Sequence, residues 1–369
     1  MPGYVPGMVT LGVEEEYLLL DLDSGLPVAR SVRVRAAADL SPAVDGGEVE
    51  PELLQSQVEV GTPVCETLDE VAEHLTRLRA AVSGAAREAG CRLAACGTPP
   101  LRAPTPVPVT AEPRYRSMAD DAPQLVDEQL INGMHVHVAI PDRDSGVAAL
   151  NRLRPWLPVL VALGANSPLW DGGDTGFASW RTLVFGRWPA SGPPPSFADA
   201  ADYRRRTQAL LDAGTIRDLG QLYWQARLSE RYPTIEVRAL DVQLEIQDAV
   251  TLAGVVRALV TTALGDHGTA RRLTRADPEL VTAAVWQAAR HGTRGQLVPP
   301  LTGRSAPAQE VVASLLDHLA PALEANGDLS RVTTGVERLR RVGTGARRQS
   351  RAFHDGGTEA VLELITVRT

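Results

Sequence analysis

The chain has 369 residues, of which 44% are hydrophobic and 22% charged, a balance typical of a globular protein with a large core. Its net charge of −8 argues against a nucleic-acid binder, which normally carries a basic face. No apolar run approaches the roughly 20 residues of a membrane helix, and residues 1–10 lack the pattern of a signal peptide. We therefore expect a cytoplasmic protein with neither a membrane nor a nucleic acid as partner.

The sequence contains three cysteines and no lysine, so all 37 basic residues are arginines. Cys65, Cys91 and Cys96 are too few and too irregular for a disulfide framework or a zinc knuckle, and we expect buried free thiols. Without lysine the chain can form neither a P-loop, nor a protein-kinase ATP site, nor a Schiff base with pyridoxal phosphate. If the protein binds ATP, then arginines, backbone amides and metal ions must hold the phosphates.

Residues 9–22 (VTLGVEEEYLLLDL) are predicted to form a strand. Side chains alternate between the two faces of a strand, so Glu14 and Glu16 point to one face and Glu15 to the other. Neighbouring carboxylates repel each other unless a cation lies between them. The pair is therefore either a site for a metal or substrate cation or an ordinary acidic stretch on a solvated face.

Residues 48–60 are predicted to form a second, unusually acidic strand. Glu59 stands between two valines, and a buried carboxylate there needs a paired cation. Glu52 is a weaker candidate of the same kind. Apolar residues at helical spacing predict a helix over 66–89, with a capping box at its start formed by Thr67 and Glu70. A short strand over 91–96 and a proline-rich loop over 99–113 follow.

Residues 131–140 (INGMHVHVAI) are predicted to form a strand with His135 and His137 on one face. Imidazoles at this spacing are common metal ligands, although two core or cross-strand histidines give the same pattern.

A helix is predicted over 146–166, with a break or a late start at its two prolines, Pro155 and Pro158. Residues 171–197 are predicted to form a long structured loop, and such loops tend to be functional. Its prominent charged residues are Asp174, Arg181 and Arg187.

Residues 233–243 (PTIEVRALDVQ) are predicted to form a strand with Glu236 and Arg238 on one face. The two side chains could form a simple ion pair across the sheet. Alternatively, the carboxylate could hold a metal while the guanidinium binds a phosphoryl oxygen. Helical patterns dominate the rest of the chain, over 247–265, 278–290, 307–324, 329–350 and 357–367.

Strands and helices alternate irregularly, and we find neither an internal repeat nor a linker. This organisation favours one α+β domain over residues 1–369, with a mostly antiparallel sheet packed with helices. A doubly wound parallel fold would show regular strand–helix units and a glycine-rich first turn. The acidic pair, the His-x-His and the Glu-x-Arg on strands together predict a metal cluster on one sheet face. Carboxylates with one imidazole suit Mg²⁺ or Mn²⁺, ions that usually accompany phosphates.

Six strings follow one another over nearly the full chain: GVEEEYLLLD (12–21), QSQVEVGTPVC (55–65), GMHVHVA (133–139), DTGFASWR (174–181), PTIEVRALDV (233–242) and RRQSRAF (347–353). Together they resemble the bacterial carboxylate–amine ligase, or glutamate–cysteine ligase type 2, family. The resemblance implies a glutamine-synthetase-like α+β fold, whose curved antiparallel sheet forms a funnel for ATP and Mg²⁺, and it suggests a homodimer. It also implies a reaction in which the γ-phosphate of ATP moves to a small-molecule carboxylate. An amine then attacks the acyl phosphate, which gives a γ-glutamyl-type amide, ADP and phosphate.

Carried over residue by residue, the resemblance implies that the metal ligands are Glu14, Glu16, Glu59, His135 and Glu236. The acidic segment over 48–60 adds Glu52 as a further candidate ligand. Arg238 stabilises the transferring phosphoryl group, contacts the nucleotide together with Glu236, and acts in catalysis together with Glu59. The residues expected to bind substrate are Arg181, His137 and Arg227. The group that takes the proton of the amine stays open between a carboxylate and His137.

The chain departs from the family pattern at two positions. It has Gln225 where family members usually have aspartate in Trp-Asp-x-Arg, and Pro99 where they often have histidine in Gly-Thr-His-Pro. These departures leave open whether glutamate and cysteine are the substrates, or whether such activity is only weak. Two alternatives therefore stand beside the ligase: a phosphotransferase of related fold, and a non-catalytic descendant that binds nucleotide.

Overall fold

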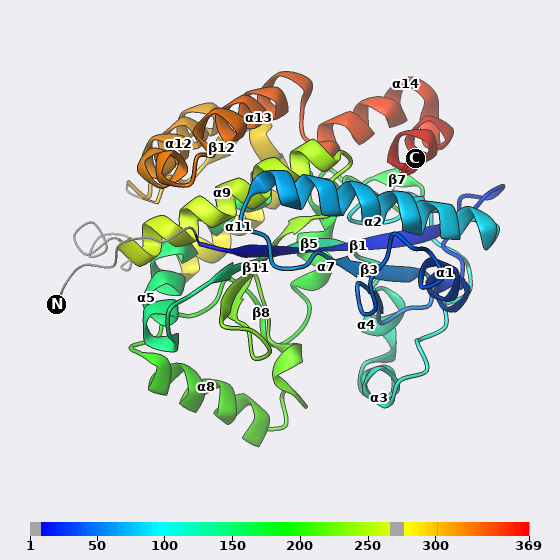
Figure 1. The fold of residues 1–369 in the computed structure, drawn as a ribbon, viewed down its shortest axis with the longest axis horizontal. Helices are drawn as coiled ribbons and strands as arrows, with labels where there is room; N and C mark the ends of the chain where they lie inside the picture. The colour runs from blue at the N-terminus through cyan, green and yellow to red at the C-terminus, as the bar shows by residue number, and fades with distance from the viewer. Residues whose placement is uncertain (1–8, 266–276, 301, 369) are drawn as a thin grey trace.

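The computed structural model describes residues 9–265, 277–300 and 302–368, and its centre is a seven-stranded sheet (Figure 1). The strand order is β10–β11–β5–β1–β3–β2, with β4 beside the second half of β1, and every pair is antiparallel. The strands of this sheet are β1 (Leu11–Asp21), β2 (Val49–Pro51), β3 (Gln57–Gly61), β4 (Cys91–Ala94), β5 (Gly133–Ala139), β10 (Ala226–Leu228) and β11 (Thr234–Asp241).

Three small two-stranded sheets flank the large one. The pairs β6–β7 and β12–β13 are antiparallel, whereas β8–β9 is parallel. Their bounds are β6 (Leu169–Trp170), β7 (Gly173–Asp174), β8 (Ser191–Gly192), β9 (Tyr223–Trp224), β12 (Gln296–Leu297) and β13 (Ala306–Pro307).

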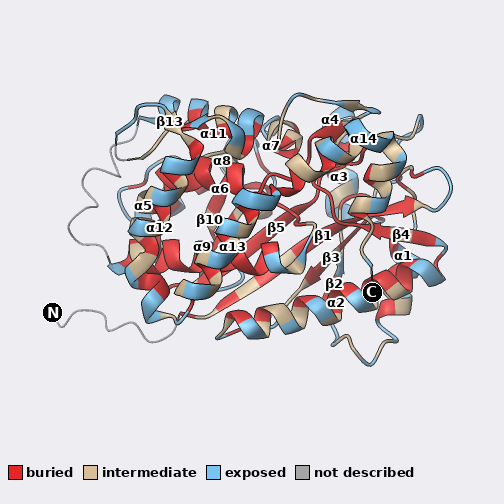
Figure 2. Ribbon diagram, turned by 90° about the horizontal axis from the view of Figure 1, so that it is seen from above, coloured by how far each residue is buried: buried red, intermediate tan, exposed pale blue. Residues whose placement is uncertain are grey.

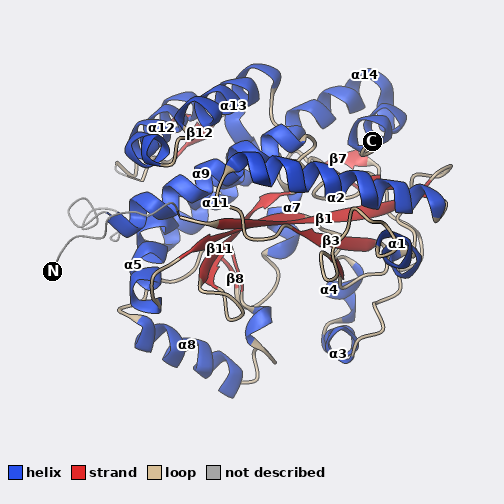
Figure 3. Cartoon of the chain, viewed as in Figure 1, coloured by secondary structure: helices blue, strands red, loops and turns tan. Residues whose placement is uncertain are grey.

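Helices lie on both sides of the sheet, as Figure 3 shows by colour. In Figure 1, α2 and α9 lie above the sheet with α12 and α13 beyond them, whereas α3, α4 and α8 lie below it. The helices are α1 (Ser31–Ala38), α2 (Leu68–Glu88), α3 (Pro113–Asp121), α4 (Pro123–Asp127), α5 (Arg143–Leu153), α6 (Leu157–Leu163), α7 (Trp180–Phe185), α8 (Ala200–Asp212), α9 (Ile246–Gly265), α11 (Pro278–His291), α12 (Ala308–Ala325), α13 (Leu329–Val342) and α14 (Gly345–Ile365). Short 3-10 turns span Arg154–Trp156, Leu219–Gln221 and Gly292–Arg294.

Helix α9 forms the centre of the hydrophobic core above the sheet. Among the described helices it alone is long and apolar enough to cross a membrane, but 89% of its apolar window is buried inside the protein (Figure 2). Its internal charges are paired, because Arg257 binds Asp328 and Asp248 binds Arg338. A helix that is apolar on all sides and surrounded by other elements is a core helix.

The register of the sheet brings distant segments together at its centre. On β1, Glu14 lies opposite Gly61 of β3 and His135 of β5, and Glu16 lies opposite Glu59. One strand further out, Glu236 of β11 lies opposite His137. Because side chains alternate along every strand, the side chains of these glutamates and histidines share one face of the sheet. They line the same cleft as residues of α3, which lies below the sheet in Figure 1, so we call this the lower face.

The α+β class and the antiparallel sheet predicted from the sequence are confirmed, and most of the predicted elements form. Helix α2 begins with the predicted capping box, in which Thr67 accepts from the amide of Glu70 and the Glu70 carboxylate accepts from the amide of Thr67. The helix predicted over 146–166 is interrupted at Pro155, as expected. The three cysteines are buried free thiols.

Three predicted elements were wrong. The strand predicted over 48–60 is two strands, because the chain turns after Pro51, which lacks the amide that would extend the ladder. The loop predicted over 171–197 contains α7, which is too short for its periodicity to show. The helix predicted over 329–350 breaks at Gly343, whose φ of 103° ends α13 before α14 begins.

Candidate active site

A cleft of about 510 Å³ opens on the lower face of the sheet. Its floor is made of β1, β3, β5 and β11, and its walls come from α3, α7 and the segment 218–223. All ten residues selected from the sequence line this cleft: Glu14, Glu16, Glu52, Glu59, His135, His137, Arg181, Arg227, Glu236 and Arg238. The structure therefore brings together every predicted site residue, although they come from segments more than 200 residues apart.

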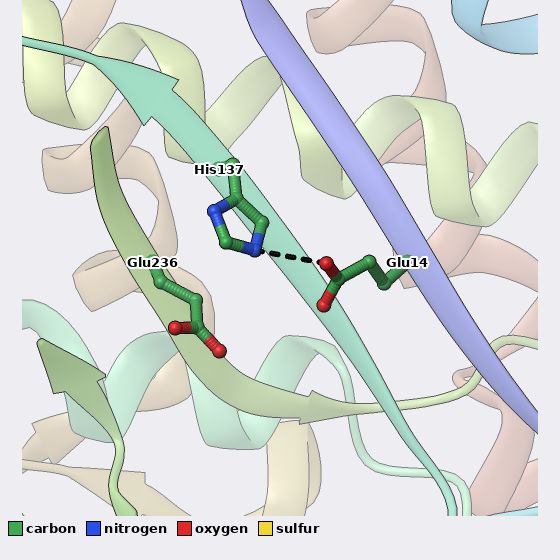
Figure 4. A group of neighbouring side chains, drawn as sticks. All are labelled: Glu14, His137 and Glu236. Atoms are coloured by element: carbon green, nitrogen blue, oxygen red, sulfur yellow. Dashed lines mark ion pairs between the residues drawn. The ribbon is translucent and has the colours of Figure 1, made fainter. Parts of the chain in front are cut away.

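Glu14 lies between the two histidines of β5. One of its carboxylate oxygens is 3.2 Å from Nδ1 of His135. The other is 3.2 Å from Nε2 of His137, the contact drawn in Figure 4. Burial raises the pKa of Glu14, but contacts with His135 and His137 outweigh burial and hold the pKa well below its ordinary value. Glu14 is therefore ionised, and its negative charge is available to a cation.

Glu16, Glu52 and Glu59 form a second carboxylate group in the cleft. Burial and the negative charge of Glu16 raise the pKa of Glu52 to about 7. Burial and the charges of Glu14, Glu52 and Glu16 raise the pKa of Glu59 well above its ordinary value. Together with Glu14, these side chains form no ion pair with a described arginine. Four carboxylates without a guanidinium partner are costly to bury unless a cation joins them.

Glu236, in contrast, is neutralised by the protein itself. Nε of Arg227 lies 2.7 Å from one carboxylate oxygen, and Arg238 binds the other. Burial raises the pKa of Glu236, but the two guanidinium groups outweigh it and hold the pKa far below its ordinary value. Both interpretations of the Glu-x-Arg pattern are therefore compatible with the structure, because the ion pair exists and also faces the cleft.

The donor atoms suit divalent cations such as Mg²⁺. Three groups each offer atoms within 4.8 Å of one another: Glu14–His137–Glu236, Glu14–Glu59–His135 and Glu16–Glu52–Glu59. The Nε2 atoms of His135 and His137 are buried beside carboxylates without a well-aligned hydrogen bond. Burial and Arg238 lower the pKa of His135, which keeps its imidazole neutral and able to coordinate a metal.

Arg181 is the cationic group of the cleft that has no ion pair with any described residue. It is 2% exposed, and its Nη1 donates to the carbonyl of Arg238 at 3.2 Å. Its guanidinium lies against Gly133, where an added Cβ would come within 2.2 Å of Nη2. The amide of Gly133 in turn donates to Glu16 at 2.5 Å. Gly133 therefore contacts both Arg181 and a member of the carboxylate group.

A buried network behind the cleft positions Arg181. Ser179 caps the start of α7, two residues before Arg181, by accepting from the amide of Thr182. Its hydroxyl donates to Asp241 at 2.9 Å, and Asp241 also accepts from Ser167 and from the amide of Asn166, each at 2.7 Å. The sequence analysis placed Asp241 only inside the strand predicted over 233–243, so sequence reasoning missed this role.

Other residues noted in the sequence lie outside the cleft. Arg187 pairs with Glu128 at the surface, and Asp174 is exposed. Gln225 and Pro99 are buried but do not line the cleft. The two departures from the family pattern therefore do not change its walls directly.

The sequence analysis also missed part of the cleft wall. Tyr115 and Arg114 come from α3, and Tyr223 comes from β9, short elements that no strong pattern announced. Gln57 did carry a signal, because it is two residues from Glu59 and therefore shares its face.

Residues 10–364 match the model of the glutamate–cysteine ligase family 2. The chain belongs to this family. Membership in the glutamate–cysteine ligase family 2 confirms the resemblance found in the sequence, and with it the prediction of an ATP-dependent ligase that forms carbon–nitrogen bonds.

Relatives of this family match over about nine tenths of their own length. A protein of Saccharopolyspora erythraea, provisionally named glutamate–cysteine ligase 2-1, is 44% identical over 346 residues, which are 94% of this chain and 90% of the relative. A protein of Rhodopirellula baltica, provisionally named glutamate–cysteine ligase 2, is 40% identical over 93% of this chain and 92% of its own.

Two solved structures share the fold at low identity. Glutamate–cysteine ligase of Francisella tularensis, determined in complex with AMP, has a TM-score of 0.71 and 12% identity, over 98% of this chain and 88% of its own. A bifunctional glutathione synthetase of Pasteurella multocida has a TM-score of 0.70 and 14% identity. The match covers 96% of this chain, which spans about half the length of that enzyme. These likenesses confirm the predicted fold.

Proposed function

We propose that this ligase activates a small-molecule carboxylate, such as the side-chain carboxylate of an amino acid, as an acyl phosphate. It then joins the activated carboxylate to an amine. ADP and phosphate are the other products. The observation that carries the proposal is the composition of the cleft. Glu14, Glu16, Glu52 and Glu59 form no ion pair with a described arginine, and five arginines line the same cleft. Phosphoryl transfer needs this combination of carboxylates for metal ions and cations for phosphate charge.

In this proposal, the residues that hold Mg²⁺ are Glu14, Glu16, Glu52, Glu59, His135 and Glu236. Bound metal neutralises phosphate charge and orients the reacting oxygens. Arg238 is held by Glu236 and lines the cleft, where its guanidinium can stabilise the transferring phosphoryl group. Arg227 binds the far side of Glu236 and keeps that carboxylate in place.

Arg181 is the proposed anchor of the substrate carboxylate. It is buried, forms no ion pair with a described residue, and lies against Gly133, whose amide donates to Glu16. A guanidinium in such a place gains its ionic partner only when an anion binds. The aromatic rings of Phe185 and Tyr223 also line this part of the cleft and can contact the rest of the substrate.

The test is Mg²⁺-dependent ADP release, with amino acids and amines offered singly and in pairs and the products identified by mass spectrometry. ADP release that requires a carboxylate together with an amine, with an amide as product, is the expected result and names the substrates. Release with one acceptor and no amide would favour the phosphotransferase. ATP binding without turnover for any pair would favour a non-catalytic descendant. A single catalytic domain over 1–369, a homodimer and a cytoplasmic location stay predictions.

A further inference from the structure

A second, smaller cleft lies where the end of α11 and the turn after it meet the start of α14. Its volume is about 180 Å³, and it shares no lining residue with the active-site cleft. Its walls are Asp174, Gly176, Phe177 and Ala178 on one side, residues 290–294 on a second, and Thr344, Ala346, Arg347 and Ser350 on a third. Nothing in the proposed reaction uses these residues.

The cleft is strongly cationic. Arg290, Arg294 and Arg347 line it, and none of them forms an ion pair with a described residue. Arg290 lies over the ring of Trp286 at 5.4 Å, and Nε of Arg347 is buried without a hydrogen-bond partner. The fourth basic side chain is that of His291. The one carboxylate of the lining, Asp174, already accepts from the amide of Gly176 at 2.8 Å.

The start of α14 adds a second, independent feature. Thr344 stands at the N-cap position of this 21-residue helix, and no acidic side chain lies in the first turn. The threonine is only 3% exposed and lines the cleft, yet its hydroxyl makes no hydrogen bond with a described residue. A helix N-terminus carries partial positive charge and attracts anions, phosphate groups in particular. Here a residue that is almost fully buried places at that terminus a hydroxyl with no hydrogen bond to a described residue.

We propose that this cleft is an accessory binding site for a phosphate group, either as inorganic phosphate or as the phosphate of a small metabolite. Three guanidinium groups match the oxygen geometry and charge of phosphate better than those of a single carboxylate. Thr344 can supply a short hydrogen bond to a fourth oxygen. A volume of about 180 Å³ suits one phosphate group with a small attached moiety and is much smaller than the active-site cleft.

The site is joined to the active site through a short segment. The amide of Ala178, in the wall of the cleft, donates to the carbonyl of Ala289 at 2.8 Å. The next amide, that of Ser179, donates to the same carbonyl at 2.9 Å, and Arg181 follows two residues later. A ligand in the second cleft therefore contacts the segment that carries Arg181. Binding itself does not depend on the proposed ligase reaction.

Calorimetric titration of the full-length protein with inorganic phosphate, at constant ionic strength, tests this site without any turnover. We expect one saturable phosphate per chain that is retained in Glu16→Gln, a variant of the active-site cleft. The double variant Arg294→Gln/Arg347→Gln should raise Kd at least tenfold, and Thr344→Val should raise it several-fold. Arg351→Gln is the matched control, because Arg351 is an exposed arginine of the same helix that does not line the cleft, and its Kd should be unchanged.

Several results would overturn the proposal. They are the absence of saturable binding at millimolar phosphate, equal affinity in the double variant, and an equal loss in Arg351→Gln. Loss of binding in Arg238→Gln instead would place the phosphate in the active-site cleft. Acetate or citrate that competes as well as phosphate would show a general carboxylate site. If the double variant fails to fold by circular dichroism, the isosteric Thr344→Val decides, and an unchanged Kd in that variant rejects the site.

Discussion

Strand β1 carries glutamates on both of its faces, and the two faces treat them in opposite ways. On the upper face, Glu15 is fully buried and binds Arg79 of α2 through two contacts of 2.5 and 2.9 Å. The hydroxyl of Tyr17 donates to the same carboxylate, and Arg79 also donates to two backbone carbonyls. On the lower face, Glu14 and Glu16 stand with further carboxylates and lack any described arginine partner.

Under the proposed function, this difference separates charges that stabilise the fold from charges that bind a ligand. Burying an ion costs several kcal/mol, which a close counter-ion and hydrogen bonds can offset. On the upper face, Arg79 and Tyr17 offset the cost of burying Glu15. On the lower face, the proposed metal ions would offset this cost for Glu14 and Glu16, so changes on the two faces should affect stability in opposite ways.

The largest expected effect is on stability, from Arg79→Leu. This substitution leaves Glu15 buried without its cation and removes two hydrogen bonds to the chain at 243–244. We expect a loss of about 3–5 kcal/mol in the free energy of unfolding, the usual result of removing one partner from a buried pair. Denaturant unfolding followed by circular dichroism measures it. The control is Arg77→Leu, also on α2, whose partner Glu48 is closer to solvent; an equal loss there would contradict the comparison.

Glu16→Gln should have the opposite effect, a loss of activity without a loss of stability. ADP release should fall at least about a thousandfold, equivalent to about 4 kcal/mol of activation free energy, because a ligand of the carboxylate group is lost. Removing a like charge beside Glu52 and Glu59 should leave the melting temperature unchanged or higher. Steady-state kinetics and a melting curve, both measured on the same sample, test these two expectations. Full activity in this variant would remove Glu16 from the metal set.

Arg181→Ala should produce an intermediate and more selective effect. We expect the KM for the carboxylate substrate to rise roughly 10–100-fold, the equivalent of one charge-assisted hydrogen-bonded pair, while the KM for ATP changes little. Kinetics with each substrate varied in turn separates the two constants. The matched variant is Arg187→Ala, on the surface beyond α7. An unchanged KM for the carboxylate in Arg181→Ala would exclude the arginine as its anchor.

The smallest effect concerns pH. The pKa of Glu52 is raised from 4.5 to about 7, so the folded state binds this proton more tightly than the unfolded state does. Stability is therefore lost as pH rises from about 4.5 through 7. Metal-free protein should melt a few degrees lower at pH 7.5 than at pH 5, and Mg²⁺ should restore the difference at pH 7.5. Glu52→Gln should show a flatter profile, and an identical profile in that variant would reject the assignment.

The contrast between the two faces of β1 could be predicted in part from the sequence. The period of two along a strand separates Glu15 from Glu14 and Glu16 without further information, and the same rule placed His135 with His137 and Glu236 with Arg238. For each strand separately, the sequence correctly indicated which side chains share a face. The sheet register then brings these strands side by side. The partner of Glu15 could not be predicted, because Arg79 lies 64 positions away on a helix whose docking depends on the whole core.

The residues that position Arg181 could not be predicted from the sequence for a similar reason. Asp241 is held by groups at 166, 167 and 179, which come from two different segments of the chain. Helix α7 has six residues and therefore shows less than two turns of periodicity. Its N-cap serine was a local signal, but such a signal alone does not show which residue the helix presents to the cleft.

The absence of lysine has a consequence for the chemistry of the cleft. An acyl phosphate is a strong electrophile, and a lysine amine held nearby would be a ready nucleophile that could trap it as a permanent amide on the enzyme. Arginine stays protonated throughout the physiological range and does not compete with the amine substrate. The cations that line this cleft are Arg114, Arg181, Arg227, Arg231 and Arg238. In the proposed reaction, these guanidinium groups can therefore bind the activated intermediate without being acylated by it.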